Sequence, residues 1–237
     1  MICIGAIAPH GDLDSAAELR AAMDELGRRV EAAQPDATIL VTPHNVHVDG
    51  HFAVVTAARV GPFETDRTLA AAAIDALRGD GIPVVGISYG GNDVTQAEHP
   101  ADWGTEIPLG CLPERPVVVV SPARDRPLDE HVRAGAALAR ATGERRVAFV
   151  ASADHGHAHD PDGPYGFDPA AAEYDALFQE LAAAAPLDFL PLAELVEAGK
   201  ADSLWQLAML QGAVPGRAEL LAYAAPTYYG MAVAVVT

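Results

Sequence analysis

Short apolar runs alternate along this chain with longer amphipathic segments. The runs are rich in β-branched residues, and four consecutive valines begin at Val117. Such continuous apolar stretches are typical of strands that are covered on both faces. Strands are therefore predicted at Ile2–Ile7, Thr38–Thr42, His51–Val60, Ile82–Ile87, Val117–Val120, Val147–Ala151 and Met231–Val236.

Helix-start signals precede most of the amphipathic segments. Ser15 and Glu18 have the spacing of a capping box, Asp66 suits an N-cap, and Asp168-Pro169 places proline at a first helical position. Helices are predicted from Ser15 to Ala33, from Asp66 to Gly79, over Leu128–Ala141, from Asp168 to Ala185, and over Leu192–Ala198 and Asp202–Gly212. This alternation predicts one α/β domain over residues 1–237, with a mostly parallel central sheet and helices on both faces.

Three histidine-bearing segments lie where predicted strands end. They are Pro9-His10-Gly11, Pro43-His44-Asn45 and Ser152-Ala153-Asp154-His155-Gly156-His157. Ligands bind at the carboxyl ends of the strands in open α/β sheets. We therefore expect these imidazoles to form a metal site or an acid–base site at that edge. Two long polar segments, Ser88–Leu112 and His155–Asp168, are predicted as loops, and loops of this length are uncommon unless they are functional.

A facial site for iron(II) needs a carboxylate beside two histidines. Four acidic residues late in the chain could supply it: Glu194, Glu197, Asp202 and Glu219. Asp202 also suits a helix cap, which needs no metal to explain it. The residues alone leave that choice open.

Composition narrows the classes of partner. The net charge of −18 would repel a phosphate backbone, so nucleic acid is not expected as a partner. No apolar stretch approaches the length of a membrane span, and the N-terminus does not read as a secretory signal. With only two cysteines, Cys3 and Cys111, a reducing cytoplasm is the expected location.

The motifs together resemble the class III extradiol dioxygenases, the family of the protocatechuate 4,5-dioxygenase catalytic subunit, and their Memo-like relatives. The resemblance spans the chain. It rests on Ala8-Pro9-His10-Gly11, Thr42-Pro43-His44, Asp102-Trp103-Gly104-Thr105-Glu106-Ile107-Pro108-Leu109 and Ser152–His157, with a weaker match over Asp202–Gly212.

The resemblance assigns roles to particular residues. His10 and His44 match the family's metal-binding histidines, and His157 matches its acid–base histidine. Asp202 is the carboxylate nearest the position of the third ligand, with Glu197 as the next candidate. Asp154 is expected to orient the site, and His155, two residues earlier than the matching histidine, is a less favoured base.

The reaction implied is extradiol cleavage of a catechol by dioxygen at iron(II). Trp103, Tyr89 and Tyr229 are candidate pocket walls, although Tyr229 and its neighbour Tyr228 could be ordinary packing residues. Arg124 and Arg126 follow a predicted strand and are the nearest basic side chains. Relatives often form oligomers, so a homo-oligomer is expected.

Two departures from the family pattern keep other functions open. The family's third ligand is usually a glutamate, whereas the carboxylate nearest that position here is Asp202. Many members have a histidine as second acid–base group where this chain has Trp103, and tryptophan does not transfer protons. A Memo-like metal-binding or redox protein without ring cleavage is therefore one alternative. A zinc hydrolase using the same ligands is another.

Overall fold

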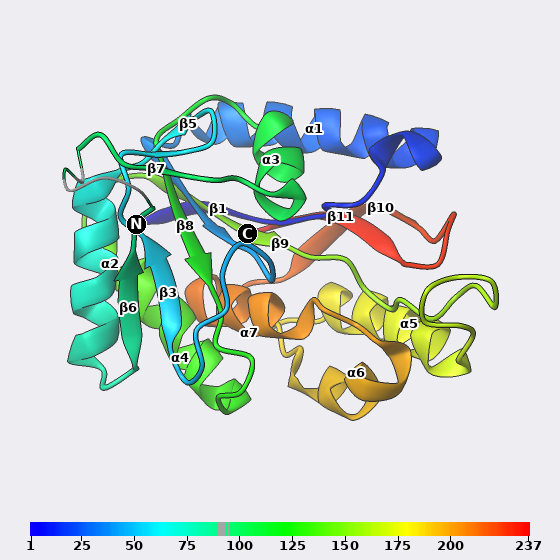
Figure 1. The fold of residues 1–237 in the computed structure, drawn as a ribbon. Helices are drawn as coiled ribbons and strands as arrows, with labels where there is room; N and C mark the ends of the chain where they lie inside the picture. Colours follow the sequence, from blue (N-terminus) through cyan, green and yellow to red (C-terminus); the bar gives the residue numbers. More distant parts are fainter. Residues whose placement is uncertain (90–92, 94) are drawn as a thin grey trace.

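A computed structural model describes residues 1–89, 93 and 95–237, and it is built around an eight-stranded sheet (Figure 1). The strands lie in the order β10-β11-β1-β9-β2-β8-β3-β6. Their bounds are β1 Ile2–Ala8, β2 Ala37–Val41, β3 Phe52–Val55, β6 Val84–Ile87, β8 Val117–Ser121, β9 Val147–Ser152, β10 Ala218–Ala224 and β11 Met231–Val236.

The centre of this sheet is parallel. Strand β9 pairs in parallel with both β1 and β2, β2 pairs in parallel with β8, and β3 does so with β6. Strands β10 and β11 form an antiparallel ribbon at one edge, and β3 runs antiparallel to β8. The predicted mostly parallel α/β architecture is confirmed. Since β1, β9 and β2 run parallel, they end at the same edge of the sheet, where ligands bind in open α/β folds.

Helices cover both faces, each over its own apolar cluster. Helices α1 (Ala17–Ala33) and α3 (Trp103–Gly110) lie over one face (Figure 1). The other face is covered by α2 (Arg67–Gly79), α4 (Leu128–Ala141), α5 (Pro169–Ala183), α6 (Ala193–Gly199) and α7 (Leu204–Ala213). Within the described part of the chain, no helix is long and apolar enough to cross a membrane.

Short elements complete the fold. Strands β4 (Arg59–Val60), β5 (Phe63–Glu64) and β7 (Glu98–His99) form a small second sheet. The 3₁₀ turns η1 (Leu13–Ser15) and η2 (Leu190–Leu192) precede α1 and α6.

Three predictions of secondary structure were wrong. The predicted strand His51–Val60 is divided into β3 and β4, which belong to different sheets. Ser15 does not cap α1: its hydroxyl donates to the carbonyl of Asp12 within η1, and α1 begins after Ala16 without a side-chain cap. The segment Ser88–Leu112, predicted as a loop, contains β7 and α3, while its residues 90–92 and 94 lie outside the described residues.

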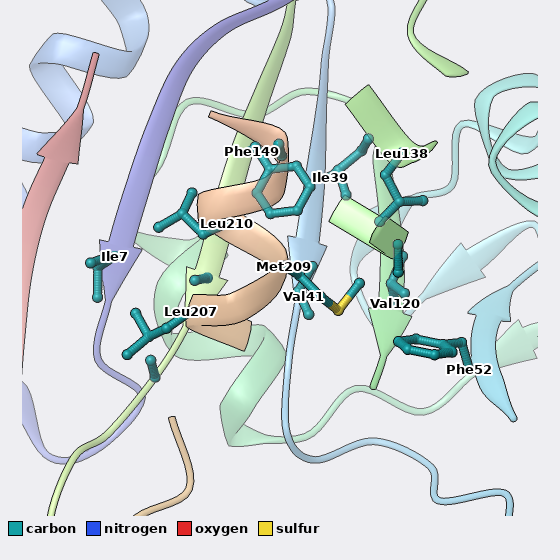
Figure 2. Packing of buried hydrophobic residues seen from close by; sticks show 14 of the residues in the cluster. Ile7, Ile39, Val41, Phe52, Val120, Leu138, Phe149, Leu207, Met209 and Leu210 are labelled. Atoms are coloured by element: carbon teal, nitrogen blue, oxygen red, sulfur yellow. The ribbon is translucent and has the colours of Figure 1, made fainter. Parts of the chain in front are cut away.

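Helix α7 is held against the middle of the sheet. Figure 2 shows Leu207, Met209 and Leu210 of α7 among buried residues of the strands, such as Phe149. The helix also approaches α4 at two glycines. A Cβ atom at Gly135 would lie 1.8 Å from the Met209 carbonyl oxygen, and one at Gly212 would lie 1.9 Å from that of Val132. Only glycine permits this close approach, which sets the distance between α4 and α7.

Candidate metal centre and catalytic cleft

Three chain segments bring polar side chains to one edge of the sheet. His10 follows β1, His44 follows β2, and Asp154 follows β9, which lies between those two strands. Asp202 does not follow a strand; it lies two residues before α7, a helix that covers one face of the sheet. The edge predicted from the strand pattern is therefore where these groups meet.

The atoms that could bind a cation lie close together. The Nε2 atoms of His10 and His44 are 3.2 Å apart. The Oδ2 atom of Asp202 is 3.5 Å from the first and 3.7 Å from the second. One ligand atom from each residue lies within 4.8 Å of the others, so the cluster has the two-histidine, one-carboxylate composition of a non-haem iron site.

The tautomer of His10 follows from its contacts. The Ser152 hydroxyl donates to the carbonyl of Gly104 at 2.7 Å, so its oxygen accepts from the Nδ1–H of His10 at 3.0 Å. In the neutral ring the lone pair of His10 then lies on Nε2, toward His44 and Asp202. A second hydrogen bond of this kind fixes ring orientation in most metal-binding histidines.

Charge in the cluster favours a cation at its centre. Burial lowers the pKa of His10, but the carboxylates of Asp154 and Asp202 outweigh burial and raise it to about 9. Burial raises the pKa of Asp202, whereas the neighbouring His10 and Arg124 bring it below its ordinary value. A proton or a metal ion between these side chains offsets their negative charge.

Asp202 has the environment of a ligand rather than of a helix cap. Its Oδ1 atom is buried and has no hydrogen-bond partner among the described residues, whereas Ser203 occupies the N-cap position of α7. An unpartnered buried carboxylate oxygen is costly and calls for a cation. Of the other candidates, Glu197 lines the cleft without joining the cluster. Glu219 pairs with Arg29 on the surface. Glu194 lies in the first turn of α6 and is not part of the cluster either.

Asp154 lies beside the cluster. Its Oδ1 atom accepts a hydrogen bond from the backbone N–H of His10 at 3.1 Å, and its Oδ2 atom is 3.5 Å from the Nε2 atom of His10. Burial raises the pKa of this carboxyl. These contacts suit the orienting role that the sequence suggested.

His157 faces the cleft with a defined free nitrogen. Its Nδ1–H donates to the carbonyl of His155 at 2.6 Å, which leaves Nε2 as a proton acceptor. The ring stacks on Tyr229, with centroids 5.5 Å apart, and contacts Tyr165 and Tyr228. An imidazole in this state suits a general base.

His155 points elsewhere. Its ring is fully buried, lies 3.9 Å from the ring of Phe178, and shares a hydrogen bond of 3.1 Å with Ser203, whose hydroxyl also contacts Tyr174. Burial lowers the pKa of His155 to about 4. It does not line the cleft, so the structure places this candidate base in the core.

The cleft has a volume of about 1000 Å³ and a partly aromatic wall. Trp103 and Tyr229 line it, as do Tyr165 and Tyr228. Tyr89, the third predicted wall residue, is 68% exposed and is not among the lining residues.

Trp103 covers His44 at the start of α3, with ring centroids 4.8 Å apart. Asp102 joins these two segments, since it caps α3 and also accepts the backbone N–H of Asn45. A Cβ atom at Gly104 would lie 2.9 Å from the His44 ring and 2.5 Å from the Thr42 hydroxyl. Glycine at this position therefore lets α3 pack directly on the metal-site loop.

Sequence reasoning missed three contributors to the site. Ser152 sets the His10 tautomer, and Tyr165 and Lys200 line the cleft. Ser152 could have been found from its place at the end of the β9 motif. Tyr165 and Lys200 carry no comparable signal.

Comparison with known proteins agrees with this arrangement. The family model described as the catalytic LigB subunit of aromatic ring-opening dioxygenase matches residues 9–236. The chain belongs to this family. LigB membership identifies the protein as an enzyme of the aromatic ring-opening dioxygenase type, and the family's dependence on a metal agrees with the cluster of His10, His44 and Asp202.

The fold is also found in a solved structure. The chain is similar to the crystal structure of an uncharacterized protein from Escherichia coli K12, with a TM-score of 0.70, 16% identity and coverage of 99% of each chain. At this identity the likeness concerns the LigB-type fold alone. A search of curated proteins gives no significant match.

Proposed function

We propose that this protein is an iron(II)-dependent extradiol dioxygenase that opens a catechol-type ring beside its two hydroxyl groups. The observation that carries the proposal is the cluster of two histidines and one buried carboxylate at a strand-end cleft, in a chain of the LigB family. His10, His44 and Asp202 would hold the metal. Bound iron(II) supplies a Lewis acid for the diol and a site for dioxygen.

The reaction needs no external reductant. One ring diol and one dioxygen molecule give one ring-opened product that contains both oxygen atoms, because the carbon–carbon bond beside the diol supplies the electrons. The protein must therefore bind the diol, remove its protons and return one. In this chain the candidate base for that task, His157, lines the same cleft as the cluster of His10, His44 and Asp202.

His157 is the proposed acid–base residue. Its Nε2 atom is free, since the other ring nitrogen donates to the His155 carbonyl. It would accept a proton from the second hydroxyl of the substrate and later return a proton to the dioxygen-derived oxygen when the O–O bond breaks during ring opening. Tyr229 stacks on the imidazole and keeps it facing the cleft.

The aromatic walls suit a flat substrate. The Trp103 ring lies over His44, and Tyr228 and Tyr229 line the cleft on the His157 side. Aromatic rings bind other rings by stacked or edge contacts. Trp103 would then wall the pocket, where many relatives have a second acid–base histidine, and His157 would carry proton transfer alone.

Oxygen uptake tests the proposal. Protein loaded anaerobically with iron(II) should consume one dioxygen per catechol and form a yellow ring-opened product. His157→Ala should retain its iron but lose about 100-fold or more in kcat, because general base catalysis contributes about 10² to 10⁴. His159→Ala is a matched control, since His159 pairs with Asp175.

Two results would contradict the proposal. Stoichiometric iron binding without oxygen uptake on any catechol would favour the Memo-like alternative. Zinc retained through purification, together with ester or amide hydrolysis, would favour a hydrolase.

A further inference from the structure

Asp175 is a buried carboxylate of α5, close behind the cleft. Its exposed fraction is 1%, and among the residues that the structure describes it is not part of the cleft lining. Burying a carboxylate is costly unless hydrogen bonds satisfy it. Three donors do so here: the backbone N–H of Gly156 at 2.7 Å, the Tyr223 hydroxyl at 2.6 Å and the Nε2 atom of His159 at 2.8 Å. The first of these donors belongs to the peptide group beside the proposed base, His157.

One peptide group connects Asp175 with His157. The carbonyl of His155 and the N–H of Gly156 belong to the same planar peptide, so they point in opposite directions. The carbonyl accepts the Nδ1–H of His157 at 2.6 Å, and the N–H donates to the Oδ1 atom of Asp175 at 2.7 Å. The carboxylate therefore acts on the imidazole through two consecutive hydrogen bonds that share this peptide.

Neighbouring contacts hold this peptide group against α5. A Cβ atom at Gly156 would lie 2.6 Å from the Ala171 carbonyl oxygen, so only glycine lets the segment pack directly on the helix. On the other side, the Gly156 carbonyl accepts the backbone N–H of Gly230 at 2.9 Å, and the Gly230 carbonyl accepts that of His155 at 2.7 Å. The peptide therefore lies at a fixed distance from Asp175, which suits a part that transmits orientation.

We propose that Asp175 is a positioning residue, which sets the tautomer and the direction of the His157 ring through the peptide between His155 and Gly156. This inference rests on the proposed function and adds a residue to its acid–base machinery. The negative carboxylate polarises the peptide and makes its carbonyl a stronger acceptor for the Nδ1–H. The lone pair on Nε2 then stays toward the cleft. Without the carboxylate, the ring is free to turn or to adopt the other tautomer.

Asp175→Asn tests the proposal, because it keeps the shape of the side chain and removes its charge. In iron-loaded protein with 4-methylcatechol, kcat should fall about tenfold or more, since outer partners of functional histidines contribute about 10- to 100-fold. KM and iron content should stay within about twofold of wild type, because the cleft wall and the metal ligands are unchanged. Tyr223→Phe is the matched control. It removes another donor from the same carboxylate but leaves the Gly156 bond, so its kcat should stay within about twofold of wild type.

A double-mutant cycle separates positioning from support of the fold. In the His157→Ala background, Asp175→Asn should change the residual kcat by less than about twofold, because no imidazole remains to be oriented. A loss of kcat of equal size in both backgrounds would mean that Asp175 only supports the fold, and the assignment would be wrong. Urea unfolding midpoints of the four proteins measure how much stability the substitution removes.

A spectroscopic readout does not depend on turnover. Long-range ¹H–¹⁵N NMR of the zinc-loaded protein at about pH 8 distinguishes the two tautomers of a neutral imidazole. His157 should be the Nδ1–H tautomer in wild type and in Tyr223→Phe, and a mixture of both tautomers in Asp175→Asn. A pure Nδ1–H tautomer in Asp175→Asn would overturn the assignment.

The two proposals fail in different ways. If wild type opens the ring and Asp175→Asn is equally active, the Asp175 assignment is wrong while the dioxygenase proposal stands. If wild type consumes no oxygen with any catechol, the dioxygenase proposal fails, and the tautomer of His157 in the zinc-loaded variants still decides whether Asp175 orients the ring.

Discussion

At the scale of single residues, His10, His155 and His157 differ in the partner of the Nδ1 atom. In His10 this atom donates to Ser152, in His157 to a carbonyl, and in His155 it contacts Ser203 within the core. In the neutral rings, these partners leave His10 with a lone pair toward His44 and Asp202 and leave His157 with a free nitrogen toward the cleft. They hold His155 in the core. The alternating spacing alone could not separate the last two, and the family resemblance favoured His157.

Ser152→Ala tests the hydrogen bond between the Nδ1 atom of His10 and the Ser152 hydroxyl. The variant leaves the Nδ1–H of His10 without its acceptor, so the ring is less firmly oriented toward the metal. We expect zinc affinity to fall about tenfold, the lower end for loss of such a partner. Competition titration against a chelator measures this, with Ser15→Ala as control, and unchanged affinity would contradict the assigned tautomer.

His155→Phe tests the buried position of His155 through the pH dependence of the free energy of unfolding. Burial keeps the pKa of His155 near 4 in the folded protein, against about 6.5 in the unfolded chain. The unfolded state therefore binds more protons between these values, and His155 contributes a loss of stability as pH falls from about 6.5 to 4, at up to about 1.4 kcal/mol per pH unit.

The His155→Phe variant should lack this contribution. Urea unfolding of metal-free wild type and variant from pH 7.5 to 4.5 should give a shallower decline for the variant. Its stability at pH 7.5 should be slightly lower, because the contact with Ser203 is lost. Parallel curves for the two proteins would show that His155 is not held neutral by the fold.

At the scale of elements, the start of α2 shows how a cap can also carry charge. Asp66 accepts the backbone N–H of Leu69 at 2.9 Å and pairs with Arg145. Burial raises the pKa of Asp66, but these two contacts outweigh it and bring the pKa below its ordinary value. A carboxyl of this kind stabilises the fold above its unfolded pKa of about 3.9, and the effect is lost as pH falls through the folded value.

Asp66→Asn should keep the cap and lose the ion pair. We expect the variant to be about 1 kcal/mol less stable than wild type at pH 7, since asparagine caps helices as well as aspartate does. The difference should close as pH falls below about 4. Urea unfolding measures the difference, and Asp75→Asn on the exposed side of α2 is the control. A difference that does not shrink as pH falls below about 4 would contradict the ion-pair explanation.

The elements that sequence patterns identified are those with a long, continuous apolar signal. The β1 and β2 runs predicted both the sheet and the edge where His10 and His44 meet. Strand β10 gave no such signal, because it is an edge strand whose side chains are mostly half-buried or exposed. Helix α3 is short and contains Gly104 and Pro108, so its composition resembled that of a loop.

At the scale of the whole molecule, the cluster joins segments that are far apart in sequence. His10 and His44 belong to the N-terminal strands, whereas Asp202 precedes α7 on the other face of the sheet. The motifs could locate the histidines, but the choice of Asp202 as the candidate third ligand depended on family resemblance. Its position follows from how α7 packs, which short-range patterns do not specify.

A metal bound at this junction should stabilise the entire fold. Zinc at 100 times its Kd is expected to add about 2.7 kcal/mol to the free energy of unfolding, provided that the unfolded chain binds it weakly. Thermal unfolding of wild type should therefore shift upward with added zinc. Asp202→Asn should lose most of this shift, and Glu197→Gln should retain it.

The reverse pattern would assign the third ligand to Glu197. Equal shifts in both variants would mean that zinc binds elsewhere. Metal content after gel filtration provides a second readout that does not depend on unfolding.

The glycine contacts between α4 and α7 extend this dependence beyond the cleft. Gly135 and Gly212 set how near the two helix axes come. Because Asp202 lies two residues before α7, its position depends on the position of that helix. A methyl group at either glycine would push α7 outward and draw the carboxylate away from the imidazoles. We therefore expect metal affinity to depend on two glycines that do not line the cleft.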